Sequence, residues 1–404
     1  MEGAPTPVSA VLLLTDGMAN RGMRSTGSIV RALESWYVSA LPGVSVHCFG
    51  YGRDHNSDML QRIASAMDGV YFFVENEDAI ASAFAECMGA LMTVSALEVE
   101  LELRAVRPLG AAGASGGAAA PTACRITEVL SANAVALEPG TRYRVKIGAL
   151  AAEQRRDILV RVRLPELTAA AAHADAKAII EAVITYRNPL TDPSGAGARA
   201  RVVARIAVVR PGEADMPAAQ PLDVEMLENV HRVDAAAALV AATRAGERGD
   251  FARGRALLQE LAERIRASGV DLRSPATAQV LRDLDRGAEG LRDARSYSWG
   301  HAHCTSSSMA HHTQRSTHVD GGSYSTTSQT TSRARWLTRT ATESAAAAAM
   351  APPAPAGPSL SRACAPGPGY WGSMLSSWTG TAASVASTAA TDAASSSGAA
   401  SSHK

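Results

Sequence analysis

The sequence lacks the features that mark nucleic-acid-binding and membrane-spanning proteins. It has no excess of charge, with 39 Lys and Arg against 39 Asp and Glu, whereas a nucleic-acid-binding surface needs a basic excess. No apolar run approaches the roughly 18 residues of a membrane span. The apolar run at residues 11–14 is also too short for the core of a signal peptide. We therefore expect no nucleic acid partner and no membrane span.

Cysteines and large apolar side chains are scarce too. The five cysteines are dispersed without a Cys-x-x-Cys pair, which predicts reduced thiols in a cytoplasmic protein. Hydrophobic residues make up 46% of the chain, but 81 of its 404 residues are alanine and only 4% are aromatic. The length allows two or three domains, while the usable core is smaller than the length suggests.

Residues 1–95 form the first predicted domain, in which short apolar runs alternate with amphipathic stretches. The apolar runs are residues 8–14, 44–50 and 69–74. Apolar residues recur at helical spacing over residues 29–41, 59–67 and 78–93. This alternation predicts an α/β fold with a mostly parallel sheet buried under helices on both faces.

The period of the pattern changes at residue 97. From Leu97 to Leu103 apolar residues alternate strictly with glutamates, as in a half-buried antiparallel strand. Further strand candidates are residues 143–150, 157–164, 178–186 and 202–209, with connections rich in Gly, Ala and Pro. Residues 96–222 are therefore predicted to form an antiparallel β-sandwich.

Residues 223–295 return to helical spacing. Two predicted helices, at residues 230–244 and 251–267, are separated by a short polar break, and Ser274-Pro275 begins a third helix. We expect a helical hairpin that packs on the sandwich or presents a surface to a partner, since one such unit makes no repeat array.

The rest of the chain has a biased composition. Residues 296–340 form an extension rich in Ser, Thr and His, and residues 341–404 contain four charged residues among mostly Ala, Ser, Gly, Pro and Thr. Such a tail buries too little side chain to offset the entropy of ordering, so we predict that residues 341–404 are disordered. Trp371 and Trp378 leave open the alternative that this tail contains a segment that docks on a partner.

Four motifs within residues 1–95 carry a family resemblance. The motifs are Thr15-Asp16-Gly17, Gly50-Tyr51-Gly52, Gly69-Val70-Tyr71-Phe72 and residues 84–89 (FAECMG). They resemble the carboxy-terminal half of a von Willebrand factor A (VWA) domain. The order of the later segments is similar to that in eukaryotic proteins that join VWA to a RING, U-box or Hint-type module. In those proteins a β-sandwich and a helical "VWA/Hedgehog intein-like" (Vwaint) region follow, which Ser307–Ala310 and Gln314–Thr317 loosely match.

The resemblance bears on metal binding through Asp16. A VWA metal site (the MIDAS) takes an Asp-x-Ser-x-Ser loop, a threonine and a final aspartate, and only the last is matched here, by Asp16. Mg²⁺ needs near-octahedral oxygen ligation, which one carboxylate with Thr15 cannot supply. We expect an incomplete MIDAS and no cofactor, with Mg²⁺ at Asp16 only where the missing loops are supplied. The alternative is that Asp16 forms a turn with Gly17 and Asn20.

The missing half of the VWA domain also has a structural consequence. Without its first three strands, residues 8–14 become a bare apolar edge that invites association. We expect that the chain is a fragment or a truncated gene model, or that a partner strand covers this edge.

Two groups of side chains carry the residue types of catalytic or zinc sites. Asp54 and His55 could act with His47 or Cys48, but strand alternation places His47 opposite Cys48, and a loop that caps the helix at residues 57–67 is the simpler prediction. Zinc prefers imidazole and thiolate, and such groups gather at His301, His303, Cys304, His311, His312 and His318. Their spacing matches no zinc finger, so we expect incidental surface histidines.

The sequence therefore predicts a non-catalytic protein–protein interaction protein of the cytoplasm. The resemblance implies two alternatives. One is the substrate-recognition part of a ubiquitin-ligase-type protein whose catalytic module is absent from this chain. The other is a metal-dependent adhesion protein, if the upstream half of the VWA domain exists.

Overall fold

The computed structural model describes residues 8–40, 43–106, 124–164, 177–192, 197–208, 223–317 and 324–350. The chain divides into two compact units, Met1–Ala345 and Ala346–Lys404. The described helices and strands belong to the first unit, apart from the end of the last helix. The predicted docking segment around Trp371 and Trp378 and most of the predicted disordered tail lie outside the described residues.

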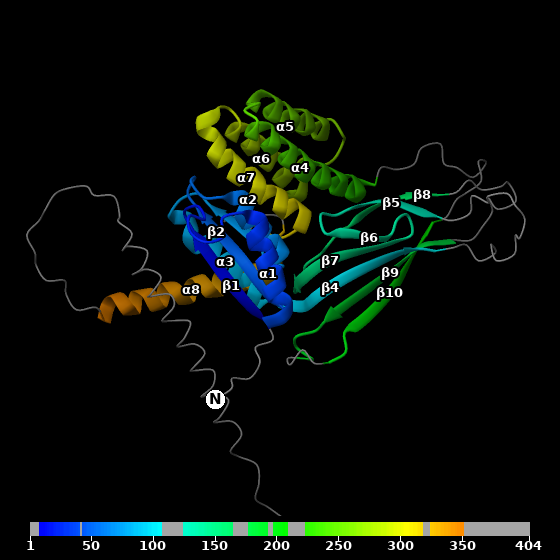
Figure 1. The fold of residues 1–404 in the computed structure, drawn as a ribbon, viewed down its shortest axis with the longest axis horizontal. Helices are drawn as coiled ribbons and strands as arrows, with labels where there is room; N and C mark the ends of the chain where they lie inside the picture. Colours follow the sequence, from blue (N-terminus) through cyan, green and yellow to red (C-terminus); the bar gives the residue numbers. More distant parts are fainter. Residues whose placement is uncertain are drawn as a thin grey trace, which may run out of the picture. The chain divides into compact units, whose positions relative to one another are not determined.

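The first part is the predicted α/β arrangement (Figure 1). Its strands β1 (Ser9–Thr15), β2 (Val44–Tyr51) and β3 (Tyr71–Val74) form a parallel sheet in the order β1-β2-β3. Helices α1 (Thr26–Ala40), α2 (Ser57–Ala66) and α3 (Asp78–Met92) alternate with the strands.

Helices cover both faces of this sheet, as predicted. On one face Val46 and Cys48 pack with the apolar residues of α1 and α2. On the other face the ring of Phe49 stacks between Phe72 and Phe84, with ring centroids 4.9 and 4.6 Å away. Such alternation follows from the period of two along a strand.

The second part consists of antiparallel strands. Strands β4 (Val94–Ala105), β6 (Ala134–Glu138), β7 (Arg142–Ala151), β9 (Lys177–Arg187) and β10 (Ala200–Val208) form a sheet in the order β10-β9-β4-β7-β6. Strands β5 (Arg125–Leu130) and β8 (Leu159–Arg163) pair separately. Ile126 of β5 shares one buried cluster with Leu103, Val145 and Ile180 of the larger sheet, so the two sheets enclose a common core. The sequence did not predict β5 and β6.

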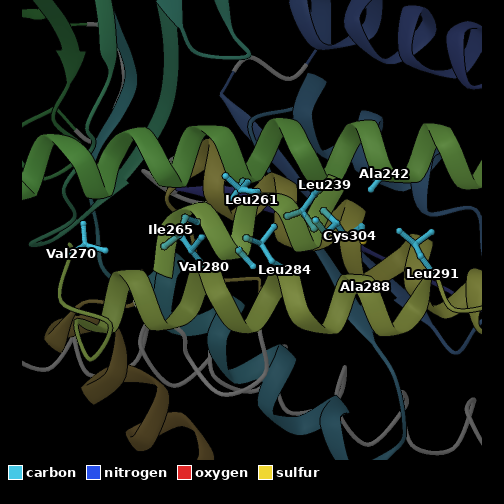
Figure 2. Packing of buried hydrophobic residues seen from close by; sticks show 13 residues of the cluster. Leu239, Ala242, Leu261, Ile265, Val270, Val280, Leu284, Ala288, Leu291 and Cys304 are labelled. Atoms are coloured by element: carbon cyan, nitrogen blue, oxygen red, sulfur yellow. The ribbon is translucent and has the colours of Figure 1, made fainter. Parts of the chain in front are cut away.

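The third part is helical. Helices α4 (Val224–Glu247), α5 (Phe251–Arg266), α6 (Pro275–Gly290) and α7 (Ala294–Thr313) pack together, and α8 (Thr327–Met350) follows. Asp223, Asp250 and Asp293 each cap the helix that follows them with a carboxylate oxygen. Figure 2 shows the apolar core between helices α4 to α7, in which Leu239, Leu284 and Leu291 are wholly buried.

Two helices differ from the sequence prediction. Helix α7 crosses the predicted boundary at residue 295 and is largely buried, because its backbone approaches α6 closely at Gly300 and Gly290. Helix α8 continues to Met350 through the alanine run at residues 345–349, inside the tail predicted to be disordered. Alanine is the best helix former, which explains the extension. None of the described helices is long and apolar enough to cross a membrane.

Candidate functional site

Asp16 lies in an exposed turn directly after β1, at the carboxyl end of the parallel sheet. The hydroxyl oxygen of Thr15 accepts a hydrogen bond from the Gly17 amide at 3.2 Å, so the neighbouring oxygen helps to close the turn. In the described part of the chain no three His, Cys, Asp or Glu side chains gather closely enough to hold a metal ion. A metal role for Asp16 therefore stays a prediction.

The strand before Asp16 is the open edge of the sheet. Among the described strands β1 pairs with β2 alone, and the register places Val11 beside Val46 and Leu13 beside Cys48. These neighbours on β2 are buried, whereas Val11 is 45% and Leu13 36% exposed. Exposed large apolar side chains follow β1 along the chain as well, namely Met18, Met23 and Trp36. The edge thus combines apolar side chains with backbone groups directed away from β2.

The opposite edge of the same sheet is covered. The backbone amide of Tyr71, at the start of β3, donates a hydrogen bond to Sδ of Met309 at 3.3 Å, and the hydroxyl of Ser306 donates to its carbonyl at 3.5 Å. Both Ser306 and Met309 belong to α7 and are buried. The two edges of one sheet therefore differ: α7 satisfies the outward-facing backbone of Tyr71 on β3, while β1 pairs with β2 alone among the described strands.

The residues weighed for acid–base chemistry take structural roles. His47 lies on the α3 face and Cys48 on the opposite face, as strand alternation predicts. The ring of His55 is buried, with Nε2 2.6 Å from the hydroxyl of Tyr71. The cap of α2 is Asn56, whose side-chain oxygen accepts from the Met59 amide at 2.9 Å. The loop caps the helix as predicted, and the capping residue is Asn56.

The described histidines predicted to be incidental surface residues are not exposed: His303 and His311 are buried and His301 and His312 half-buried, so that prediction was wrong. His301, His303, Cys304, His311 and His312 lie on α7, where His303 is 5% and His311 0% exposed. His318 lies outside the described residues. Helix α7 is the central helix of its layer and packs against α4, α6 and α2, so its Ser and His side chains are enclosed from several sides.

His311 is the centre of a buried polar chain. Its Nδ1 lies 2.6 Å from the hydroxyl of Tyr324, and its Nε2 lies 3.1 Å from Oδ2 of Asp283. The second contact has the distance of an ion pair without the alignment of a hydrogen bond. Asp283 also accepts from the amide of Gln279 at 3.0 Å. Burial raises the pKa of Tyr324, so its hydroxyl stays protonated and contributes a hydrogen bond, with no activated nucleophile.

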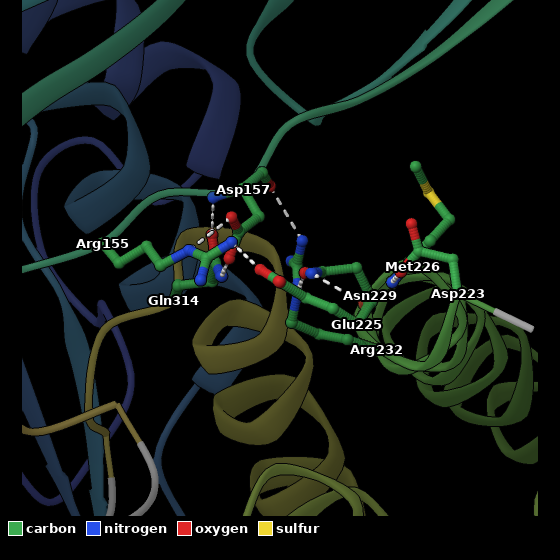
Figure 3. Close-up of polar contacts among 8 residues, drawn as sticks. All are labelled: Arg155, Asp157, Asp223, Glu225, Met226, Asn229, Arg232 and Gln314. Carbon is green, nitrogen blue, oxygen red and sulfur yellow. Dashed lines mark hydrogen bonds and ion pairs between the residues drawn. The ribbon is translucent and has the colours of Figure 1, made fainter. Parts of the chain in front are cut away.

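A second polar network joins the sandwich to the helices (Figure 3). Arg232 of α4 donates to the backbone carbonyls of Asp157 at 2.8 Å and His311 at 2.6 Å. Gln314 lies in the left-handed turn that ends α7. Its side-chain oxygen accepts a hydrogen bond from the Asp157 amide at 2.6 Å, and its side-chain nitrogen donates to the Asp157 carboxylate at 3.0 Å. Arg155 pairs with Asp157 and with Glu225 of α4. The loop before β8 is therefore held by α4 and by the end of α7.

The described cysteines are not poised for chemistry. Cys48, Cys87, Cys124 and Cys304 are free and buried. Burial raises the pKa of Cys48 and of Cys304 to about 12, which keeps both thiols protonated at neutral pH. A nucleophilic cysteine requires a lowered pKa and an accessible position.

Sequence reasoning missed Arg156, Arg232, Arg315 and the Asp283–His311–Tyr324 chain. The only local signal for the first of these is the charged run at residues 153–157. A charged run is usually a solvated surface, and the backbone carbonyls that hold Arg232 and Arg315 lie 75 or more residues away in the chain.

Comparison with known proteins gives structural likeness alone. No family model matches the sequence, and no curated protein matches it. Among solved structures, the chain is similar to a von Willebrand factor type A protein from Catenulispora acidiphila, with 17% identity and a TM-score of 0.48 over 76% of this chain and 66% of that chain. It is also similar to the ArnB paralog VWA2 from Sulfolobus acidocaldarius, with 11% identity and a TM-score of 0.35 over 75% of this chain and 64% of that one. The chain thus covers slightly less than two thirds of each of these two proteins.

Proposed function

We propose that the chain is a non-catalytic interaction protein of the VWA type, which binds a partner protein along the open edge of β1. The contrast between the two edges of the parallel sheet carries this proposal. Helix α7 satisfies the backbone of Tyr71 on β3 through Ser306 and Met309, while β1 exposes Val11 and Leu13 and pairs with β2 alone among the described strands. A strand from a partner would complete the sheet by main-chain hydrogen bonds.

The composition of β1 supports an edge that is covered in use. Natural edge strands that stay exposed carry charged residues that prevent association. Strand β10, the edge of the larger sheet, follows that rule: its exposed Val202 and Ile206 are interleaved with Arg201 and Arg205. Strand β1 (SAVLLLT) has no charged residue at all. The partner segment that suits it is an extended, apolar strand.

We also propose a family placement for the chain. The order of α/β part, antiparallel sheets and helices supports a Vwaint-type chain of the cytoplasm, which by resemblance would act beside ubiquitin-ligase modules. Its role there would be to select a partner, with catalysis supplied elsewhere. Two observations support the absence of catalysis within the described residues. His311 and Asp283 are 0% and 2% exposed, and the described thiols are buried.

Recovery of partners by two matched variants of the full chain tests the proposal. Tagged wild type is purified from the cells that express it, beside Val11→Lys/Leu13→Lys and the control Val202→Lys/Ile206→Lys. Each double variant places two lysines on an edge strand at positions 36–50% exposed in the wild type. We expect one or more proteins to be enriched with wild type and with the β10 control, and at least tenfold less with the β1 variant.

Two further measurements complete the experiment. Circular dichroism and thermal unfolding of the three chains establish that the β1 variant is folded. Equal recovery of partners by all three chains would reject β1 as the surface, and the absence of any enriched protein would reject the interaction function. A wild-type dimer that dissociates in the β1 variant, measured by sedimentation velocity, would assign the edge to a second copy and contradict a separate partner.

A further inference from the structure

A cavity of about 80 Å³ lies where the α/β part, the sandwich and the helices meet. One water molecule needs roughly 10–15 Å³ measured in this way, so the cavity has room for several waters or one small ion. Ser65 and Asn133 on its wall are exposed, which connects it to solvent. Six residues of its wall carry the argument: Lys146, Arg156, Arg232, His312, Gln314 and Arg315.

Three of these six are arginines from different parts of the chain, and two of them are held by backbone carbonyls. Arg232 donates to the carbonyls of Asp157 and His311. Arg315 donates to the carbonyl of Asp68 at 2.9 Å and to that of Ala149. Carbonyl groups orient a guanidinium without neutralising it, and the only carboxylates that act on these two arginines are those of the wall, Asp157 on Arg232 and Asp68 on Arg315, among the described residues.

Arg156 forms no ion pair with any of the described residues and, unlike the other two, has no carboxylate among them that acts on its charge. The residue is half-buried, and its Nε atom is buried with no hydrogen-bond partner among the described residues. Burial, followed by the charges of Arg315 and Arg232, lowers the pKa of Arg156 well below its usual range. Its environment is therefore one of like charge, which is costly for a buried cation.

Each of the two carboxylates on the cavity wall is already engaged by other side chains, namely Asp157 by Arg155 and Gln314 and Asp68 by Lys146. The Asp157 carboxylate pairs with Arg155 at 2.8 Å and accepts from Gln314 at 3.0 Å. The Asp68 carboxylate pairs with Lys146 at 3.1 Å. Burial lowers the pKa of His312 to about 4, so its ring is neutral at pH 7 and adds no charge. The wall thus holds three guanidiniums and an ammonium against two carboxylates.

We propose that this cavity is a binding site for a phosphate group, with the Arg156 guanidinium as its principal ligand. A guanidinium binds tetrahedral oxyanions through two parallel N–H donors, and the buried Nε of Arg156 supplies a donor that no described residue uses. A phosphate would neutralise the mutual repulsion of Arg156, Arg232 and Arg315. Since these residues come from the loop before β8, from α4 and from the segment after α7, the bound anion would tie the sandwich to the helices.

Thermal unfolding and calorimetric titration of the full chain test the site. The probe is inorganic phosphate, added at constant ionic strength against chloride, and a parallel arm uses glycerol phosphate to distinguish a free anion from a phosphate ester. A ligand that binds only the folded state stabilises it in proportion to the logarithm of its concentration. We expect saturable binding and a phosphate-dependent rise in Tm for the wild type.

Arg156→Gln is the decisive variant, with Arg161→Gln as its control. Arg161 lies on β8 of the same sandwich, is 67% exposed and pairs with Glu128. We expect Arg156→Gln to bind phosphate at least tenfold more weakly, and to unfold in phosphate-free buffer at the same temperature as the wild type or higher, because the like-charge contact is gone. Arg161→Gln should bind as the wild type does.

The outcomes separate the proposal from its alternatives. Tighter binding of either phosphate or glycerol phosphate supports a phosphate site and names its source. A Tm that responds to phosphate no more than to chloride would overturn the proposal, as would equal binding by wild type and Arg156→Gln. A crystal structure of the phosphate-soaked chain that shows only water at Arg156 Nε would overturn it as well. None of these results depends on the partner proposed for β1.

Discussion

The backbone amide of Tyr71 donates a hydrogen bond to the sulfur of Met309, 3.3 Å away and 238 residues later in the chain. The contact lies at the edge of the parallel sheet, where an unsatisfied amide would otherwise be buried. Met309 also belongs to the apolar cluster between the sheet and α2. One side chain therefore fills space in the first core and satisfies the backbone of the first sheet, which makes α7 part of the α/β unit.

Met309→Ala should destabilise the chain by about 2–5 kcal/mol, because truncation leaves a cavity and a buried amide without its acceptor. Urea unfolding followed by circular dichroism measures this change. The control is Met92→Ala at the end of α3, where the side chain is 62% exposed and the expected cost is below about 0.5 kcal/mol. Equal costs for the two variants would contradict the role given to Met309.

Asp283 and Asp285 lie two residues apart on α6 in opposite environments. Asp283 is 2% exposed and faces His311, whereas Asp285 forms an exposed pair with Arg266 at 2.9 Å. We expect Asp283→Asn to cost about 1–3 kcal/mol, because one buried acceptor becomes a donor without a partner. Asp285→Asn should cost less than about 1 kcal/mol, as exposed ion pairs do. The free energy of unfolding in urea, measured for both, checks the difference.

The fold was predictable where burial follows a simple period. The apolar runs around Val46 and Phe72 predicted the parallel strands, and the stripe through Leu258 and Ile265 predicted a helix, because each presents a continuous apolar face. Helix α7 was not predictable, since its buried positions carry residues such as Ser307 and His311. Their polar groups are satisfied by partners distant in the chain, and no local pattern encodes those partners.

The two candidate sites also differ in how far the sequence predicts them. Strand β1 could be predicted as an open edge, because the sequence shows an apolar run and the resemblance implies that the strands beside it are missing. The cavity at Arg156 could not, because a buried arginine and a solvated one look alike in the sequence. Only the folded chain brings Arg232 and Arg315 to the same wall.

Gly69→Ala should destabilise the chain by more than about 3 kcal/mol. A Cβ atom at Gly69 would lie 1.8 Å from the carbonyl oxygen of Val46, and both backbones are fixed there, since the Val46 amide donates to the Met67 carbonyl and the Gly69 amide to that of Ala64. Neither can move without breaking the turn between α2 and β3.

The control for this variant is Gly27→Ala at the start of α1, where a Cβ would contact nothing within 4 Å. Alanine is favoured over glycine in a helix by up to about 1 kcal/mol, so this control should be neutral or slightly stabilising. The yield of folded protein and the urea midpoint report both effects. A Gly69→Ala variant as stable as the wild type would show that the turn can shift.

The stability of the chain should fall as the pH drops below about 6.5, and His47 should account for part of the loss. Burial, with a smaller effect of the Arg315 charge, lowers the pKa of His47 to about 3, while an unfolded histidine has a pKa near 6.5. Between these values the unfolded chain binds a proton that the folded chain does not, so stability is fully present above pH 6.5 and declines toward pH 3. His312, with a pKa of about 4, acts in the same direction. Each such histidine contributes a slope of up to about 1.4 kcal/mol per pH unit.

Urea unfolding of wild type and His47→Gln at pH 8.0, 6.0 and 5.0 separates the two effects of the substitution. Lost packing lowers the variant's curve by the same amount at every pH, whereas the missing titration makes that curve shallower than the wild-type curve below pH 6.5. Parallel curves would show that His47 is protonated in the folded chain at its ordinary pKa.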